Sequence, residues 1–155
     1  MAGLMQLSAA PDGVSLRVVP AQLNLGQKFT LDLNARQGGV LRILTVDDQP
    51  DAKLSLIFPN PHDQRDAVAP GTAVKVPRTS QWSLVAQPPR GRAWMIAIVA
   101  PSAPSAGSFK PLSLQQAVQA FSDGQPQRLL GLPDCPAASA CRSEVAVQAA
   151  EFTIR

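Results

Sequence analysis

The sequence has few of the residues on which most enzymatic and metal chemistry depends. Its 155 residues contain one histidine, two cysteines and no tyrosine, and only 5% are aromatic and 16% charged. A mononuclear metal site built from histidine and cysteine therefore has few possible ligands. The longest uncharged apolar run covers residues 93–100, which is far short of the roughly 18 residues that a membrane-spanning helix needs.

Proline and short apolar runs are what the sequence has in quantity. It contains 15 prolines, and 45% of its residues are hydrophobic. This proline content is about double the usual share, and it favours short strands joined by turns over long helices. The length suits one domain with a real core, and the apolar content is too high for a disordered chain.

The charge is modest and evenly spread. Fourteen lysines and arginines against 11 acidic residues give a net charge of +3. A surface that follows a phosphate backbone normally concentrates its basic residues on one face, whereas the tightest pair here is Arg90 and Arg92. Trp82 and Trp94 lie near basic residues in the sequence, but tryptophans on strands are more typical of a core. We therefore expect no nucleic-acid partner.

Alternation of apolar and polar residues predicts a mainly β fold. Residues 29–35 alternate cleanly, with Phe29, Leu31 and Leu33 on one face. The first third of the chain is interpreted as an antiparallel meander, and the apolar segment 92–100 as a central strand covered on both faces. We expect an immunoglobulin-like antiparallel β-sandwich of seven or eight strands. The expected strands are residues 14–19, 29–35, 40–46, 53–58, 72–76, 81–86, 92–100 and 145–154.

One helix is expected near the C-terminus, over residues 113–122. Leu114, Ala117, Val118 and Phe121 recur at helical spacing, and Ser113 is suited to the N-cap. Residues 14–155 are predicted to form a single domain, and residues 1–13 a flexible leader or expression remnant.

The two cysteines, Cys135 and Cys141, fall in a loop expected over residues 131–142. A proline and small residues between them allow the Cβ atoms to approach bridging distance. A close pair without a partner histidine is more typical of a disulfide than of a metal or redox site. A disulfide would place the domain outside the cytoplasm, and two free cytosolic thiols are the alternative. Since residues 1–10 lack the features of a signal peptide, we expect the chain to be a domain of a longer protein.

No segment of the sequence predicts an active site. His62 lies in a polar loop, and the chain has no Gly-x-Ser-x-Gly motif that would present a nucleophile. Asp47, Asp48 and Asp51 are typical turn residues, and whether they bind a cation is left open. We expect no catalytic, cofactor-binding or metal-binding residue, and therefore a domain that is not an enzyme.

Several short motifs resemble one bacterial family in the right order. A hydrophobic strand closes in Leu-Ile-Phe-Pro-Asn, a Pro-Gly turn leads to a short strand ending in proline, and a second proline–glycine turn feeds the apolar strand 92–100. These features are similar to the domain-of-unknown-function family 4384. Departures are Gln27 and Lys28 in place of an acidic residue and Arg90 inserted between Pro89 and Gly91. The motif residues are Phe58, Pro59, Asn60, Pro70, Gly71, Pro77 and Gly91.

The resemblance implies a cellular setting for the domain and no particular reaction. Such domains are appended to bacterial Ser/Thr protein kinases and caspase-like peptidases and occur near type VI secretion genes. It implies a non-catalytic sensory module, the periplasmic C-terminal domain of a membrane-anchored kinase that binds a protein or cell-envelope ligand. The alternative is an adaptor of a type VI secretion apparatus. The expected contact surfaces are the loop from Pro59 to Gly71 and the face near Trp82.

Overall fold

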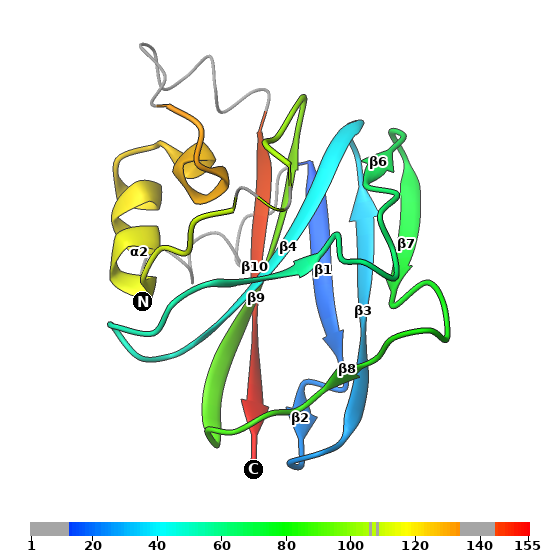
Figure 1. The fold of residues 1–155 in the computed structure, drawn as a ribbon, viewed down its shortest axis with the longest axis vertical. Helices are drawn as coiled ribbons and strands as arrows, with labels where there is room; N and C mark the ends of the chain where they lie inside the picture. The colour runs from blue at the N-terminus through cyan, green and yellow to red at the C-terminus, as the bar shows by residue number, and fades with distance from the viewer. Residues whose placement is uncertain (1–12, 106, 108, 134–144) are drawn as a thin grey trace.

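The computed structural model describes residues 13–105, 107, 109–133 and 145–155, and these form two packed β-sheets with a helical layer outside one of them (Figure 1). Strand residues dominate the described part of the chain, so the expectation of a mainly β fold is confirmed. The elements are β1 (Val14–Val19), β2 (Gln22–Leu23), β3 (Lys28–Ala35), β4 (Gly39–Asp47), β5 (Ser55–Phe58), β6 (Ala67–Val68), β7 (Thr72–Val76), β8 (Leu84–Val85), β9 (Gly91–Ala100), α2 (Leu114–Ser122), η2 (Pro126–Leu130) and β10 (Ala146–Ile154).

The smaller sheet has the order β1-β3-β7, with β8 paired to β3, and the larger has the order β2-β10-β9-β4-β5, with β6 paired to β4. All neighbours are antiparallel except β2 and β10, which run parallel. The chain enters the smaller sheet as β1 and crosses to the edge of the larger one as β2. These first two consecutive strands therefore connect the two sheets.

The larger sheet is buried on both faces, and β9 shows this most clearly. Met95, Ala97 and Val99 belong to the core between the sheets. Trp94, Ile96 and Ile98 belong to a second core, which α2 and η2 complete on the outer face. The prediction of a central strand covered on both sides is confirmed.

The expected meander over the first third of the chain is wrong at its middle connection, although β1 pairs antiparallel with β3 and β4 with β5. β3 lies in the smaller sheet and β4 in the larger, so these consecutive strands are not paired. The chain changes sheets at Gly39, where φ is +152° and a Cβ would lie 2.4 Å from the Ala100 carbonyl oxygen. β3 buries one face and β4 buries two, which explains why they occupy different layers.

Helix α2 begins as its sequence predicts. Ser113 is the N-cap, and its hydroxyl and the Gln116 side chain bond reciprocally to each other's backbone N–H groups. Leu114, Ala117 and Ala120 are buried against the sheet, whereas Val118 and Phe121 pack at the margin of the second core. The small alanines face the sheet because they allow a close approach. None of the helices in the described residues is long and apolar enough to cross a membrane.

Other element boundaries differ from the expected ranges. Only Leu84–Val85 of residues 81–86 forms a strand, and Lys53 makes an isolated bridge to Ser113 instead of extending β5. The short helix η2 was not expected. β10 begins one residue later than predicted and ends at the predicted Ile154.

Candidate functional site

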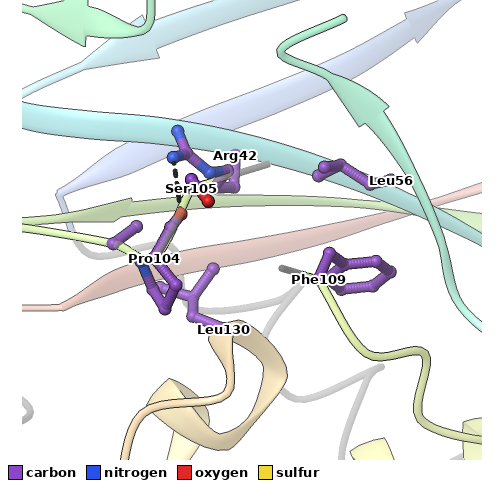
Figure 2. A pocket seen from close by; sticks show the side chains of 7 residues that line it. Arg42, Leu56, Pro104, Ser105, Phe109 and Leu130 are labelled. Atoms are coloured by element: carbon purple, nitrogen blue, oxygen red, sulfur yellow. Dashed lines mark hydrogen bonds between the residues drawn. The ribbon is translucent and has the colours of Figure 1, made fainter. Parts of the chain in front are cut away.

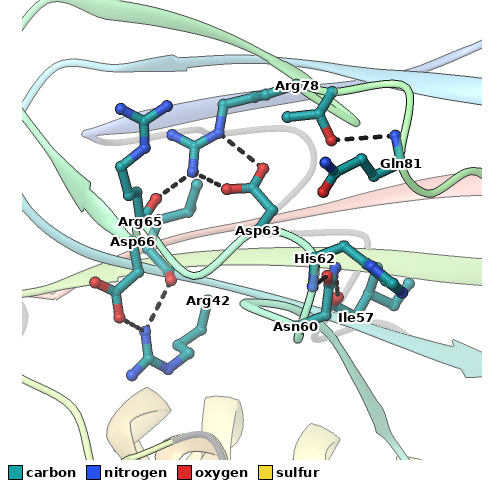
Figure 3. A network of polar contacts seen from close by, with 11 residues as sticks. Arg42, Ile57, Asn60, His62, Asp63, Arg65, Asp66, Arg78 and Gln81 are labelled. Atoms are coloured by element: carbon teal, nitrogen blue, oxygen red, sulfur yellow. Dashed lines mark hydrogen bonds and ion pairs between the residues drawn. The ribbon is translucent and has the colours of Figure 1, made fainter.

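The Phe-Pro-Asn motif forms a tight turn at the end of β5. Phe58 is fully buried. The Asn60 side chain donates from Nδ2 to the Ile57 carbonyl at 3.1 Å and accepts from the backbone N–H of His62 at 2.9 Å (Figure 3). Asn60 and Asp63 also exchange two backbone hydrogen bonds, of 3.1 and 3.0 Å. The motif therefore fixes the start of the segment 59–66, which we call the motif loop.

An ion pair holds the middle of the motif loop to the residue after Pro77. The Arg78 guanidinium donates to both carboxylate oxygens of Asp63, at 2.5 and 3.0 Å, and also to the Arg65 carbonyl. Its carbon Cζ lies 5.1 Å from the centroid of the Phe58 ring, within cation–π range. Asp63 is only 6% exposed, and its hydrogen bonds to Arg78 hold its pKa below the usual range despite burial.

A second arginine fixes the end of the motif loop. Arg42 lies on β4, and its side chain is 7% exposed. It donates to the Asp66 carboxylate at 2.6 Å, to the Leu41 carbonyl at 3.1 Å and to the Pro104 carbonyl at 3.0 Å. Figure 2 shows the guanidinium beside Pro104, in a small hollow that is also lined by Leu56, Phe109 and Leu130. Arg42 thus joins the larger sheet, the motif loop and the segment that follows β9.

A groove of about 640 Å³ runs along the motif loop. His62, Gln64 and Arg65 are exposed on this loop. The groove is a shallow surface of mixed polarity next to a loop whose two ends and middle are fixed. Its lining residues are Arg42, Leu56, Pro59, Asn60, Pro61, Gln64, Asp66, Ser105 and Gly107.

The other motif residues lie away from this loop. Pro70 and Gly71 form the turn before β7, where Gly71 has a φ of +78° and its N–H donates to the Ala35 carbonyl at 2.7 Å. Gly91 begins β9 and pairs with Ile154. The motif residues therefore do not converge on one site, and those at Phe58–Asn60 and Pro77 are brought together through Arg78.

Trp82 is a weaker candidate for a contact surface than its sequence position suggests. Its side chain is half-buried and packs against the core between the sheets. Much of the ring is therefore committed to the core and not available to a partner.

The three aspartates that follow or end β4 do not assemble a cation site. Asp48 forms an ion pair of 2.9 Å with Arg92, Asp51 is exposed, and Asp47 lines a separate cavity. Within residues 13–105, 107, 109–133 and 145–155, no three acidic, histidine or cysteine residues are placed to share a metal ion. Cys135, Cys141 and their predicted disulfide lie outside the described residues.

Comparison with known families supplies a classification. Residues 22–103, just over half of the chain, match the family described as "Domain of unknown function (DUF4384)". The chain belongs to this family. The DUF4384 segment extends from β2 to the loop after β9, so it includes the motif loop and both of its arginines, whereas α2, η2 and β10 lie beyond it. Searches of curated proteins and of solved structures each gave no significant match.

Sequence reasoning located the motif loop but missed the residues that hold it. Arg42, Asp63 and Arg78 were not predicted to act together. One signal was present, because Arg42 interrupts an otherwise apolar strand, and a buried cation needs a nearby anion. The partner could not be chosen from the sequence, since Asp63 and Asp66 both lie in the same polar loop.

Proposed function

We propose that this DUF4384 domain is a non-catalytic recognition module that binds a protein or cell-envelope ligand through the motif loop. The observation that carries the proposal is the attachment of this loop by two arginines from different strands or strand ends. Arg42 holds Asp66, and Arg78 holds Asp63 and the Arg65 carbonyl. Binding loops are commonly positioned in this way on a rigid scaffold.

Because the loop is fixed before binding, less conformational entropy is lost when a ligand binds. The exposed His62, Gln64 and Arg65 are then presented at defined positions beside the groove of about 640 Å³. The ion pairs themselves are largely buried, so the exposed side chains are the ones that a partner would contact.

The fold is proposed to be immunoglobulin-like in outline. The strand orders β1-β3-β7 and β2-β10-β9-β4-β5 support this when the two-residue β2 is left out of the count. An immunoglobulin sandwich likewise pairs its first two strands in one sheet and places its last two strands beside its third in the other. Loops at the ends of such sandwiches are frequent recognition sites.

The proposed setting is the periplasmic C-terminal part of a membrane-anchored bacterial Ser/Thr protein kinase. Support comes from the resemblance of the motifs to kinase-appended domains and from the close cysteine pair, Cys135 and Cys141. In this setting the module would sense a ligand outside the cytoplasm and relay its presence inward.

Site-specific photo-crosslinking in the native host tests the recognition surface. A photoreactive residue is placed at Gln64 in the motif loop or, as control, at Lys75, which is exposed on β7. We expect a discrete adduct from position 64, absent from position 75 and lost when Arg65 and Asp66 are both charge-reversed. Equal labelling from both positions, or an adduct unaffected by the charge reversal, would contradict the proposal. Capture of a secretion component would favour the adaptor alternative.

A further inference from the structure

A cavity of about 350 Å³ lies at one end of the sandwich and is lined by none of the residues of the motif loop. The segment that contains β8 crosses this end of the molecule, near the ends of β2 and β10 (Figure 1). Residues 83–88 form one wall, and the inner face of the larger sheet forms the other. The volume falls within the ~300–1,000 Å³ typical of small-molecule sites.

The walls are mainly apolar, and Thr45, Ser83 and Gln87 are the uncharged polar residues among them. Phe29 and Phe152 stand on opposite sheets with their ring centroids 5.7 Å apart, and the polar side chains are few. The apolar lining residues are Phe29, Ile57, Leu84, Val85, Ala86, Pro88, Ala93, Met95, Phe152 and Ile154.

Among the described residues that line the cavity, Asp47 is the single ionisable one. It lies on the same face of β4 as Leu41 and Ile43, which belong to the core between the sheets. No side-chain hydrogen bond or ion pair in the described part of the chain reaches its carboxylate, and burial alone raises its pKa. Its neighbour Asp48 has Arg92 as a partner.

A carboxylate at the edge of a mainly apolar cavity loses part of its hydration on folding, which is unfavourable unless a partner replaces the water. We propose that the cavity is a binding site for a small amphipathic amine, with the ammonium group on Asp47 and the hydrocarbon body between the sheets. A carboxylate only accepts hydrogen bonds, so a protonated amine complements both its charge and its acceptors. The apolar walls then bury the rest of the ligand.

The position of the site separates it from the proposed recognition loop. Asp47 lies at the end of β4 opposite to Gly39, whereas Arg42, which holds the motif loop, lies nearer the start. The described residues that line the cavity and those that line the groove do not overlap, although both sets include residues of β4 and β5. Failure of one proposal therefore leaves the other intact.

Titration with three matched six-carbon probes tests the amine site. Hexylamine, hexanol and hexanoate are added to the isotope-labelled full chain, and amide and methyl chemical shifts are followed by NMR. We expect saturable binding of hexylamine, with shifts confined to residues that line the cavity, weaker binding of hexanol and none of hexanoate.

Two variants and one control assign the binding to Asp47. D47N should weaken hexylamine binding at least about tenfold, while D51N, which changes an exposed aspartate nearby, should leave it unchanged. A86L, which fills the cavity from the β8 side, should abolish binding of every probe. The proposal is overturned if hexylamine fails to saturate, if its shifts map elsewhere, or if it binds D47N as tightly as the wild type.

Discussion

At the scale of single residues, two aspartates on the same scaffold have opposite electrostatic roles. Asp63 is buried and bonded to Arg78, so its negative charge is stabilised in the folded state. Asp47 is partly buried and has no side-chain partner among the described residues, so its charge is disfavoured there. Replacement by asparagine keeps the shape and removes the charge, and it should change stability in opposite directions at the two positions.

D63N should lower the free energy of unfolding by about 3 kcal/mol at pH 7, because it leaves the Arg78 guanidinium without its counter-ion. The pKa of Asp63 is lowered by folding, so the stability from this pair is present above its unfolded pKa of about 3.9. That stability is lost as the pH falls through the lower folded-state pKa. Urea unfolding at pH 7 and at pH 3 measures both effects.

Asp32 provides the matched control for D63N. It pairs with Arg17 at 3.3 Å, but the side chains are 40% and 76% exposed. D32N should therefore cost less than about 1 kcal/mol. If D63N is no more destabilising than D32N, the Arg78 pair does not fix the motif loop.

D47N should raise the free energy of unfolding at pH 7 by less than about 1 kcal/mol, since it removes a charge from a position that is only partly buried and is screened by solvent. Folding raises the pKa of Asp47, so the penalty applies above the folded-state pKa. It is relieved as the pH falls to the unfolded value. The variant and the wild type should therefore converge in stability on acidification, whereas D51N should match the wild type throughout. Destabilisation by D47N would show that its carboxylate has a stabilising partner.

At the scale of elements, the helical layer depends on small residues that face the sheet. Ala117 is fully buried in the second core, while Gln115 on the same helix is exposed. A117E should destabilise the domain by about 3 kcal/mol or more, because it forces a charge into an apolar interface. Q115E should change stability little. Thermal unfolding of the two variants compares them, and equal melting temperatures would mean that α2 does not pack on the sheet as described.

The elements differ in how far their sequence determines them. The two-sided burial of β9 and the start of α2 follow from local pattern, since apolar side chains on both faces and a serine cap need no knowledge of distant contacts. The separation of β3 and β4 into different sheets does not follow, because the turn at Gly38–Gly39 is compatible with a hairpin. The clash of a Cβ at Gly39 with Ala100 exists only in the assembled fold.

The candidate site shows the same division. The Phe-Pro-Asn turn could be placed on an exposed loop from its sequence, because proline ends a strand and asparagine bonds readily to nearby backbone. The pairs Arg42–Asp66 and Arg78–Asp63 span 24 and 15 residues. Several acidic residues were equally available to each arginine, so only the packed structure selects the partners.

At the scale of the whole molecule, the domain consists of a sandwich and an added helical cover. The second core joins residues of β4 and β9, within the DUF4384 segment, to α2 and η2 beyond it. The apolar residues Leu44, Val46 and Ile96 would otherwise face water on the outside of the larger sheet. The helical layer therefore completes the burial that the strands require, and no residue of α2 or η2 lines the groove along the motif loop or the Asp47 cavity.

The thiol state of Cys135 and Cys141 in the native host tests the proposal that this module recognises its ligand outside the cytoplasm. Free thiols are trapped with an alkylating agent in living cells, and the peptide that contains both cysteines is weighed. We predict a bridged pair that is alkylated only after reduction. Two cysteines alkylated without reduction would place the domain in the cytosol and contradict this proposal.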